Sequence, residues 1–342
     1  MDIQTYCGID LHKKFSAVCL MDEAGQIIQQ RKVYHQGGEL EAFFQSQSAL
    51  KVALEPVDNW GWVVDALQGL GHEVHLANTY KVRLIAESRI KTDKVDARVL
   101  ADLLRTGFLP EAYVAEPKLR DQRTYLRHRI DLGRQRARIK SQIKRLLRVE
   151  NTQVPEFANL FGKKGRVWLE QTQLRPVHER IKQEALDTIK YYDTRIAHLD
   201  AEIRRQCESD ATIQQLMTIP GVGKLTAQVI MAEVGVMERF PSPKHFASYC
   251  GLAVSQRSSG GKTHFGSITK QGNRNIRWLL VEAAQKAKFS DPNLKRFFDR
   301  IAYKRGRNKA TVAVARKLAE ICWQVVTKKT NYDTNRVCRQ VG

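Results

Sequence analysis

The sequence lacks a long run of apolar residues. None reaches the roughly 18 residues that a membrane-spanning helix needs, and the N-terminus lacks the basic-then-apolar pattern of a secretory signal. Cysteines are few and scattered: the six contain no Cys-x-x-Cys pair, and the nine histidines show no zinc-ligand spacing with them. Cys7 and Cys19 lie in apolar, strand-like runs, which favours reduced core thiols. We therefore expect a cytosolic protein without structural zinc.

Acidic residues are in deficit. The chain of 342 residues has 36 Asp and Glu against 57 Lys and Arg, which gives a formal charge of +21 and a pI near 9.8. A charge of this size predicts a polyanionic partner, nucleic acid before membrane. The length suits two or three domains, each able to bury a core.

The first 116 residues predict an α/β fold with a mixed sheet. Three strands are expected to form an antiparallel meander, and two later strands alternate with helices. The expected strands cover residues 6–11, 15–21, 26–34, 51–55 and 73–76, and the expected helices cover 39–45, 60–70 and 80–88.

Four acidic residues occupy distinctive positions in this part of the chain. Asp10 ends the first strand and Glu55 ends the fourth, and sites in such sheets gather at strand ends. Asp93 and Asp96 lie one turn apart at the start of a helix expected up to Thr106. Converging carboxylates of this kind can hold two Mg²⁺ ions about 4 Å apart for phosphoryl transfer. The alternatives are a helix-start signature for the aspartate pair and a simple strand end for each lone acid.

Residues 117–210 predict a basic helical hairpin. The first helix, expected over 118–148, is rich in Lys and Arg and has only Asp121 and Asp131 to oppose them. The second follows Pro176 and repeats apolar residues in steps of three and four, which is a coiled-coil seam usable for self-association. The scarcity of acids on the first helix favours phosphate contact over a solvated surface.

Residues 211–342 predict a mainly α-helical domain. Pro220 to Gly223 resemble a helix-hairpin-helix turn, which either approaches a phosphate or merely connects two helices. Ser255 to His264 form a Ser/Gly stretch, usually a flexible loop, that is flanked here by Arg257 and Lys262. A serine attacks phosphate only where a base or a strong cationic field assists it, and these basic residues could supply that field.

Two motif sets, in this order, carry a resemblance to a known family. The first is Gly8-Ile9-Asp10, then Glu55, then Lys91-Thr92-Asp93-x-x-Asp96-Ala97-Arg98. The second is Ser258-Ser259-Gly260-Gly261-Lys262, then Lys270-x-Gly272-Asn273-Arg274-x-x-Arg277. The first set resembles the Asp-Glu-Asp-Asp residues of a RuvC-like, ribonuclease-H-type domain. Together the two sets resemble the insertion-sequence transposases of the IS110 family and the related pilin-gene invertase.

One departure from the family pattern follows Glu55. The family often has a small Ala-Thr-Gly-like segment at this point, whereas this chain has Pro56-Val57-Asp58. Asp58 is therefore a candidate fifth acid.

The resemblance implies a DNA recombinase that moves its own insertion sequence and is guided by a structured RNA encoded beside its gene. It implies that two Mg²⁺ ions are bound by Asp10, Glu55, Asp93 and Asp96. Ser259 matches the position that attacks DNA and becomes a phosphoserine, and Ser258 is the neighbour that could be confused with it. Basic residues of the same segment are expected to clamp phosphates: Arg257, Lys262, Lys270, Arg274 and Arg277.

The resemblance also carries expectations about partners and location. Element ends and target DNA would be the substrates. The acids and the serine lie on different domains, so one site can be completed between protomers, and a dimer or tetramer is expected. The expected setting is the bacterial or archaeal cytoplasm, at the nucleoid.

Two other functions fit the same residues. One is a metal-dependent, structure-selective nuclease, in which water attacks and Ser259 is only part of a loop. The other is a non-catalytic nucleic-acid-binding scaffold. Replacing Ser259 by alanine separates the nuclease from the recombinase, and replacing Asp10 by alanine separates the scaffold from both.

Overall fold

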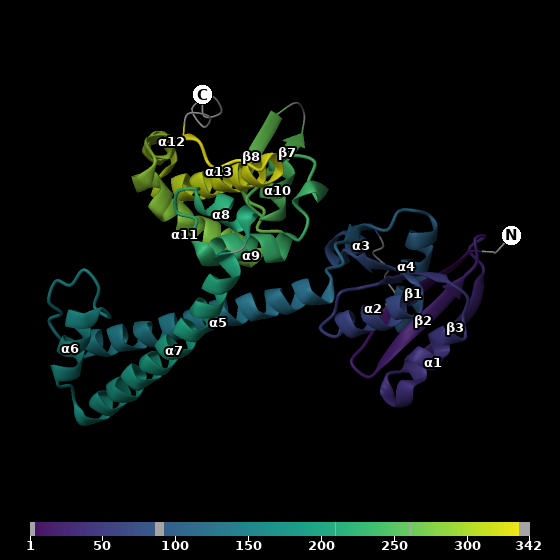
Figure 1. Ribbon diagram of the computed structural model, residues 1–342, viewed down its shortest axis with the longest axis horizontal. Helices are drawn as coiled ribbons and strands as arrows, with labels where there is room; N and C mark the ends of the chain where they lie inside the picture. Colours follow the sequence, from purple (N-terminus) through teal and green to yellow (C-terminus); the bar gives the residue numbers. More distant parts are fainter. Residues whose placement is uncertain (1–3, 86–91, 209, 260–261, 335–342) are drawn as a thin grey trace. The chain divides into compact units, whose positions relative to one another are not determined.

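Figure 1 shows the computed structural model of the chain, which describes residues 4–85, 92–208, 210–259 and 262–334. Two compact units make up the protein, Met1–Lys118 and Leu119–Gly342. Within the described ranges no helix combines the length and apolar character needed to cross a bilayer.

A six-stranded mixed sheet forms the centre of the first unit, in the order β3-β2-β1-β4-β5-β6. The first three strands form an antiparallel meander, while β1, β4 and β5 run parallel, and β6 closes the far edge antiparallel to β5. The predicted mixed, ribonuclease-H-type sheet is confirmed, and β6 is an addition to it. The strands are β1 (Thr5–Leu11), β2 (Phe15–Met21), β3 (Ile27–Tyr34), β4 (Leu50–Leu54), β5 (Glu73–Ala77) and β6 (Glu111–Ala112).

Helices cover both faces of this sheet. The 3₁₀ turn η1 (Gln36–Gly38) leads into α1 (Glu39–Gln45), which packs with α2 (Trp60–Gly69) on the face that carries Ile9 and Leu54. On the opposite face, α3 (Thr79–Ile85) and α4 (Asp93–Arg105) pack over Ala53 and Ala77. The expected helix over 80–88 ends outside the described residues.

Small residues let α4 approach the sheet closely. A Cβ atom on Gly8 would lie 1.9 Å from the carbonyl oxygen of Ala97, so only glycine fits beneath the helix at this point. Ala17 and Cys19 of β2 form a small core with Ala97 beside it. The first turn of α4 therefore lies against the end of β1 that carries Asp10.

The second unit begins with a long helical hairpin, as predicted. Helices α5 (Pro117–Val149) and α7 (Pro176–Glu208) are joined through α6 (Lys163–Gln171) (Figure 1). Ile189 of the predicted α7 seam lies in one hydrophobic cluster with Ile143 of α5, and Ile203 lies in another with Ile130 of α5. The seam is thus filled by a helix of the same chain.

Several basic residues of α5 have acidic partners on other helices. Arg129 binds Asp200 of α7 through two hydrogen bonds of 2.7 and 2.8 Å, and Arg136 binds Asp193 of α7 at 2.6 Å. The partners of these two arginines come from α7 and not from α5, whose own acids are few as the sequence indicated. The predicted phosphate contact therefore concerns other basic residues of α5. Other basic side chains of α5 are exposed: Arg138, Lys144, Arg145 and Arg148.

The rest of the second unit is the predicted mainly α-helical domain around an extensive hydrophobic core. The expected Ser/Gly loop is, however, a β-hairpin, and the sequence reading was wrong on this point. Val254, Thr263, Phe265 and Ile268 favour extended backbone and outweigh the serines and glycines. The elements are α8 (Ala211–Met217), α9 (Lys224–Val234), η2 (Met237–Arg239), α10 (Pro243–Tyr249), β7 (Val254–Ser259), β8 (Lys262–Ile268), α11 (Arg274–Ser290), α12 (Pro292–Arg305) and α13 (Arg307–Lys328).

The helix-hairpin-helix-like turn has a packing role. Gly221 has a φ of +81°, and a Cβ atom there would lie 2.3 Å from the carbonyl oxygen of Ala283 in α11. The left-handed backbone and the close approach to α11 both require glycine. This turn therefore joins α8 to α9 and packs closely against α11.

Candidate active site

Two of the predicted acids follow neighbouring parallel strands. The register pairs Ile9 of β1 with Leu54 of β4, so Asp10 and Glu55 come next at the same edge of the sheet. Side chains alternate along a strand, and Gly8 lies under α4, so Asp10 points toward the α4 face as well. Glu55 directly follows β4 and is half-buried.

The other two acids lie in the first turn of α4. Thr92 caps the helix, since its Oγ1 accepts a hydrogen bond of 3.3 Å from the backbone N–H of Val95. The helix-start reading is therefore correct for Thr92, and the same helix start delivers Asp93 and Asp96 to the sheet edge. Lys91, which opens the motif, lies outside the described residues.

A histidine joins this acidic group. Asp10, His12 and Asp93 each offer a ligand atom within 4.8 Å of the others. The Nε2 of His12 lies 3.1 Å from Asp10 Oδ2 and 3.4 Å from Asp93 Oδ1. Glu55 and Asp96 are not part of that 4.8 Å group. The sequence reading missed His12, whose signal is its position two residues after Asp10 at the end of β1.

Neighbouring residues hold this group in place. The side-chain amide of Asn59 donates to the backbone carbonyl of His12 at 3.0 Å, which ties the turn before α2 to the end of β1. Lys32 of β3 lies 3.7 Å from Asp93 Oδ2. Asp58, the candidate fifth acid, is exposed in the same turn as Asn59.

The predicted nucleophile lies in the β7–β8 hairpin of the second unit. Ser259 is the last residue of β7 and pairs with Lys262, while Ser258 pairs with Thr263 and Arg257 pairs with His264. Every residue of β7 is exposed. Ser258 and Ser259 point to opposite faces of the hairpin because side chains alternate. Gly260 and Gly261 lie outside the described residues.

The two faces of the hairpin differ in chemistry. On one face Ser258 Oγ lies 3.1 Å from Thr263 Oγ1 and 3.4 Å from the side-chain amide of Gln256. On the other face Ser259 shares its side with Arg257 and with His264, the partner of Arg257 across the hairpin. Ser259 therefore lies on the basic face and Ser258 on a neutral one.

The remaining predicted clamp residues surround the base of the hairpin. Lys270 is exposed, with a φ of +56°, and Arg274 is exposed at the first position of α11. Arg277 instead donates to the carbonyl oxygens of Cys250 at 3.3 Å and Lys270 at 3.0 Å. Arg277 thus holds the base of the hairpin together.

Comparison with known proteins places both units in one family. A family model described as a transposase of the DEDD, IS110 type matches residues 7–151, and the model of the "Transposase IS116/IS110/IS902 family" matches residues 213–299. The chain belongs to this family of transposases. The resemblance inferred from the two motif sets is thereby confirmed.

Two relatives match along nearly the whole transposase, and a third matches about half of it. It is 26% identical over 333 residues to the transposase for insertion sequence element IS1328 of Yersinia enterocolitica, covering 95% of this chain and 98% of the relative. It is 26% identical over 337 residues to the transposase for insertion sequence element IS1111A of Coxiella burnetii, covering 95% and 90%. The pilin gene-inverting protein of Moraxella bovis is 31% identical over 173 residues, 46% of this chain and 54% of that protein.

The acidic group of the transposase suits a divalent cation. Burial raises the pKa of the Asp10 carboxyl above its ordinary value, and the charges of Asp96 and Asp93 raise it further, while His12 lowers it. Like charges gathered at a half-buried position repel one another, and a bound cation relieves that repulsion. Carboxylate oxygens suit Mg²⁺ and Mn²⁺, and an imidazole nitrogen extends the range toward softer metals.

The raised pKa of Asp10 predicts a pH-dependent stability in cation-free protein. The folded state binds more protons than the unfolded state between the ordinary pKa and the raised one, so the free energy of unfolding falls as pH rises through this window. Asp10→Asn removes the buried charge. We expect its melting temperature in EDTA to exceed that of the wild type by a few degrees at pH 7, and this advantage to vanish near pH 3.

The control for this prediction is Asp58→Asn, since Asp58 is exposed in the turn before α2. Thermal melts of the three proteins across the pH range measure the effect. An Asp10→Asn melting temperature equal to or below that of the wild type at pH 7 would contradict the electrostatic account.

Proposed function

We propose that this transposase is an RNA-guided DNA recombinase that moves its insertion sequence through a covalent phosphoserine intermediate. The observation that carries the proposal is the acidic edge of the sheet, where Asp10 meets the start of α4 in a chain that matches the family along both units. The basic hairpin that presents Ser259 supplies the second half of the chemistry.

The acids at the sheet edge would hold the cation. We propose that two Mg²⁺ ions bind to Asp10, Glu55, Asp93 and Asp96. His12 lies beside this set. When bound, the cation would neutralise charge on the phosphoryl oxygens during transfer. Because α4 packs closely against Gly8, the distance between the acids at the strand ends and those on α4 is fixed.

Ser259 would be the nucleophile. Its Oγ forms a bond to the phosphorus atom while the bond from phosphorus to one deoxyribose oxygen breaks. The serine proton passes to solvent or a nearby base, and the released deoxyribose oxygen takes up a proton as a hydroxyl. The new serine phosphodiester keeps the energy of the broken bond, so a second DNA strand can reverse the reaction at a new site.

Basic residues of the second unit would bind the DNA backbone around Ser259. Arg257 lies on the same face of β7 as Ser259, and Lys262 pairs with Ser259 across the hairpin. Lys270 and Arg274 follow β8, and both residues are exposed. Arg277 completes the predicted clamp, and its bonds to Cys250 and Lys270 give it the role of fixing the other members in place.

The partners that we propose are inferred from the net charge and from the placement of the acids and the serine in different units. A formal charge of +21 suits two nucleic acids at once, a guide RNA and the DNA of the element ends and target. The acids and the serine belong to different units of the chain. We therefore propose a dimer or tetramer in which protomers complete each site, working in the cytoplasm at the nucleoid.

A denaturing gel tests this function. Protein is mixed with joined element ends, target DNA, the RNA transcribed from beside the gene, and Mg²⁺. We expect a protein–DNA adduct whose peptide carries the phosphodiester on Ser259, identified by mass spectrometry after nuclease digestion. Leaving out the RNA should abolish the adduct.

Removing the metal is a separate prediction. EDTA should reduce adduct formation by at least about 10³-fold, because the charge on the phosphoryl group is then no longer neutralised. Adding Mg²⁺ or Mn²⁺ back should restore it. Nicked DNA without any adduct, made equally well by Ser259→Ala, would instead establish the metal-dependent nuclease.

A further inference from the structure

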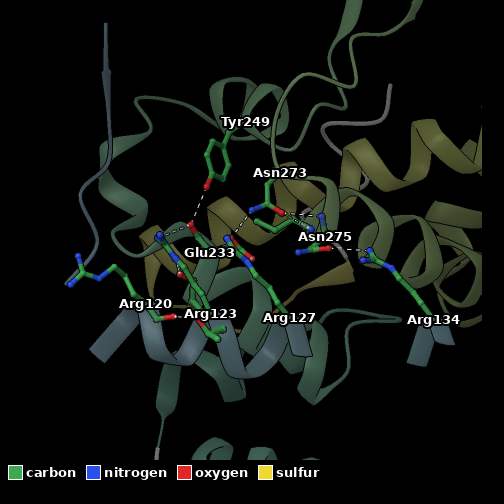
Figure 2. A network of polar contacts seen from close by, with 11 residues as sticks. Arg120, Arg123, Arg127, Arg134, Glu233, Tyr249, Asn273 and Asn275 are labelled. Carbon is green, nitrogen blue, oxygen red and sulfur yellow. Dashed lines mark hydrogen bonds and ion pairs between the residues drawn. The ribbon is translucent and has the colours of Figure 1, made fainter. Parts of the chain in front are cut away.

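A buried glutamate at the end of α9 connects three elements around the serine hairpin. The side chain of Glu233 is only 4% exposed. Its two carboxylate oxygens accept hydrogen bonds of 2.7 and 2.6 Å from Arg127 of α5. One of these oxygens also accepts a bond of 2.8 Å from the side-chain amide of Asn273. Figure 2 shows these groups converging from separate parts of the chain.

The backbone around Glu233 takes part in the same network. Its carbonyl oxygen accepts a hydrogen bond of 3.0 Å from the hydroxyl of Tyr249 and one of 3.1 Å from Arg123 of α5. Arg123 also donates to the carbonyl oxygen of Ala232 at 2.6 Å. The residue therefore binds α5 through both its side chain and its backbone, and it binds α10 through Tyr249 (Figure 2).

Two of the partners of Glu233, Tyr249 and Asn273, flank the hairpin on either side. Tyr249 ends α10 shortly before β7, and Asn273 caps α11 shortly after β8. The backbone N–H of Asn273 donates to the carbonyl of Tyr249 at 2.9 Å. The N–H of Lys270 likewise donates to the carbonyl of Gly251 at 3.2 Å. Both ends of the β7–β8 hairpin thus meet at Glu233, Asn273 at its carboxylate and Tyr249 at its backbone carbonyl.

The turn that bears Asn273 tolerates little movement. Gly272 has a φ of +131°, and a Cβ atom there would lie 2.1 Å from the carbonyl oxygen of Tyr249. The side chain of Asn273 accepts bonds of 3.0 Å from the N–H groups of Asn275 and Ile276, which starts α11. A small displacement at Glu233 would therefore be passed to the hairpin through this turn.

The carboxylate of Glu233 is kept charged. Burial alone would raise its pKa, but the hydrogen bonds and charge of Arg127, together with the amide of Asn273, hold the pKa below its ordinary value. A third α5 arginine supports the same region, since Arg134 donates to the side chain of Asn275 at 3.0 Å. A buried network that is fully satisfied in this way rigidifies the elements it joins.

We propose that Glu233 is a positioning residue for the nucleophile, holding the hairpin that carries Ser259 in a fixed place relative to α5. This proposal rests on the proposed serine chemistry. Glu233 lies away from Ser259 in the chain and acts through Tyr249 and Asn273. A misplacement of about 1 Å between reacting atoms can lower the rate about 100-fold. Holding the hairpin rigidly therefore has a direct effect on the rate of catalysis.

The test is Glu233→Gln in the full-length protein. Glutamine keeps the shape of the side chain but presents an NH₂ group, and both Arg127 and Asn273 are donors, so one contact becomes repulsive. We expect the single-turnover rate of adduct formation at saturating DNA to fall about 10- to 100-fold. The dissociation constant for DNA should change by no more than about twofold, because no residue of the basic face is altered.

The matched control is Asp200→Asn. Asp200 accepts two hydrogen bonds from Arg129, two residues along α5 from Arg127, but it joins α5 to α7 and not to the hairpin. Both substitutions weaken an arginine–carboxylate pair on the same helix. Only Glu233→Gln should slow the rate constant and increase hydrogen exchange at the amides of Lys270 and Asn273. A purely structural role would lower the melting temperature or the active fraction in both variants and leave the rate constant unchanged.

A second variant, at Asn273, keeps the proposal testable if Glu233→Gln folds poorly. Asn273→Asp retains the cap of α11 but sets a second carboxylate 2.8 Å from Glu233, and it should slow adduct formation at least as much. Combining Asn273→Asp with Glu233→Gln restores a donor facing an acceptor and should recover most of the lost rate. Wild-type rates and exchange in Glu233→Gln, or no recovery in the double variant, would overturn the proposal. Failure of the wild type to form any adduct would refute the serine chemistry, while the hydrogen exchange comparison would still decide the role of Glu233.

Discussion

The substitution Ser259→Ala is expected to abolish the covalent protein–DNA adduct, by at least about 10⁴-fold and so below detection. Alanine removes the only atom of the side chain that can bond to phosphorus. The cation site lies in the other unit of the chain, so binding of Mg²⁺ should be unchanged. DNA binding should change by no more than about twofold, since Ser259 is an exposed residue on a basic face.

The control for this prediction is the adjacent serine. Ser258 and Ser259 are both exposed at the end of β7, but Ser258 points to the other face of the hairpin and contacts Thr263. Ser258→Ala should therefore form adduct at a rate within a few-fold of the wild type. A result with the two variants exchanged would place the nucleophile on the neutral face and refute the assignment of Ser259. Retention of the adduct in both single variants would exclude serine chemistry at this hairpin.

Much of the fold could be predicted because its signals are local. Short apolar strands with turns between them indicated the meander and the parallel strands, and the seam of α7 indicated a helical partner. The acidic positions were predictable for the same reason. An acid at the end of β1 and a capped helix start at Thr92 are visible in sequence, and the order of the strands brings them to one edge.

The residues that were missed depend on contacts between distant parts of the chain. His12 was overlooked because a single histidine after a strand carries no spacing signal, and only the approach of α4 brings Asp93 beside it. Glu233 lies in an apolar helix that reads as core, and its partner Arg127 is more than one hundred positions earlier in the sequence. The ion pairs of α5 arginines could not be predicted for the same reason, since their acids lie on α7 and α9.

Gly8→Ala is expected to disable the acidic site without altering any acid. The new Cβ atom would lie 1.9 Å from the carbonyl oxygen of Ala97 and 2.6 Å from the backbone nitrogen of Ala101, both in α4. Backbone atoms of a helix cannot rotate away, so α4 must move outward and carry Asp93 and Asp96 with it. Overpacking of this kind costs about 1–3 kcal/mol of unfolding free energy. We also expect the affinity for Mn²⁺, measured by calorimetry, to fall at least about tenfold, and adduct formation to fall with it.

Gly69→Ala provides the matched control in the same unit. Gly69 is the last residue of α2, and a Cβ atom there meets no other atom within 4 Å. The same exchange should stabilise the protein by about 0.4–1 kcal/mol, because alanine reduces the freedom of the unfolded chain. Cation binding should stay at the wild-type level. Equal melting temperatures and equal Mn²⁺ affinities in the two variants would show that the seat of α4 on β1 does not set the geometry of the acidic site. If Gly8→Ala lowers stability and cation binding while Gly69→Ala raises stability and leaves cation binding unchanged, the absence of a side chain at position 8 is required for the cation site at Asp10.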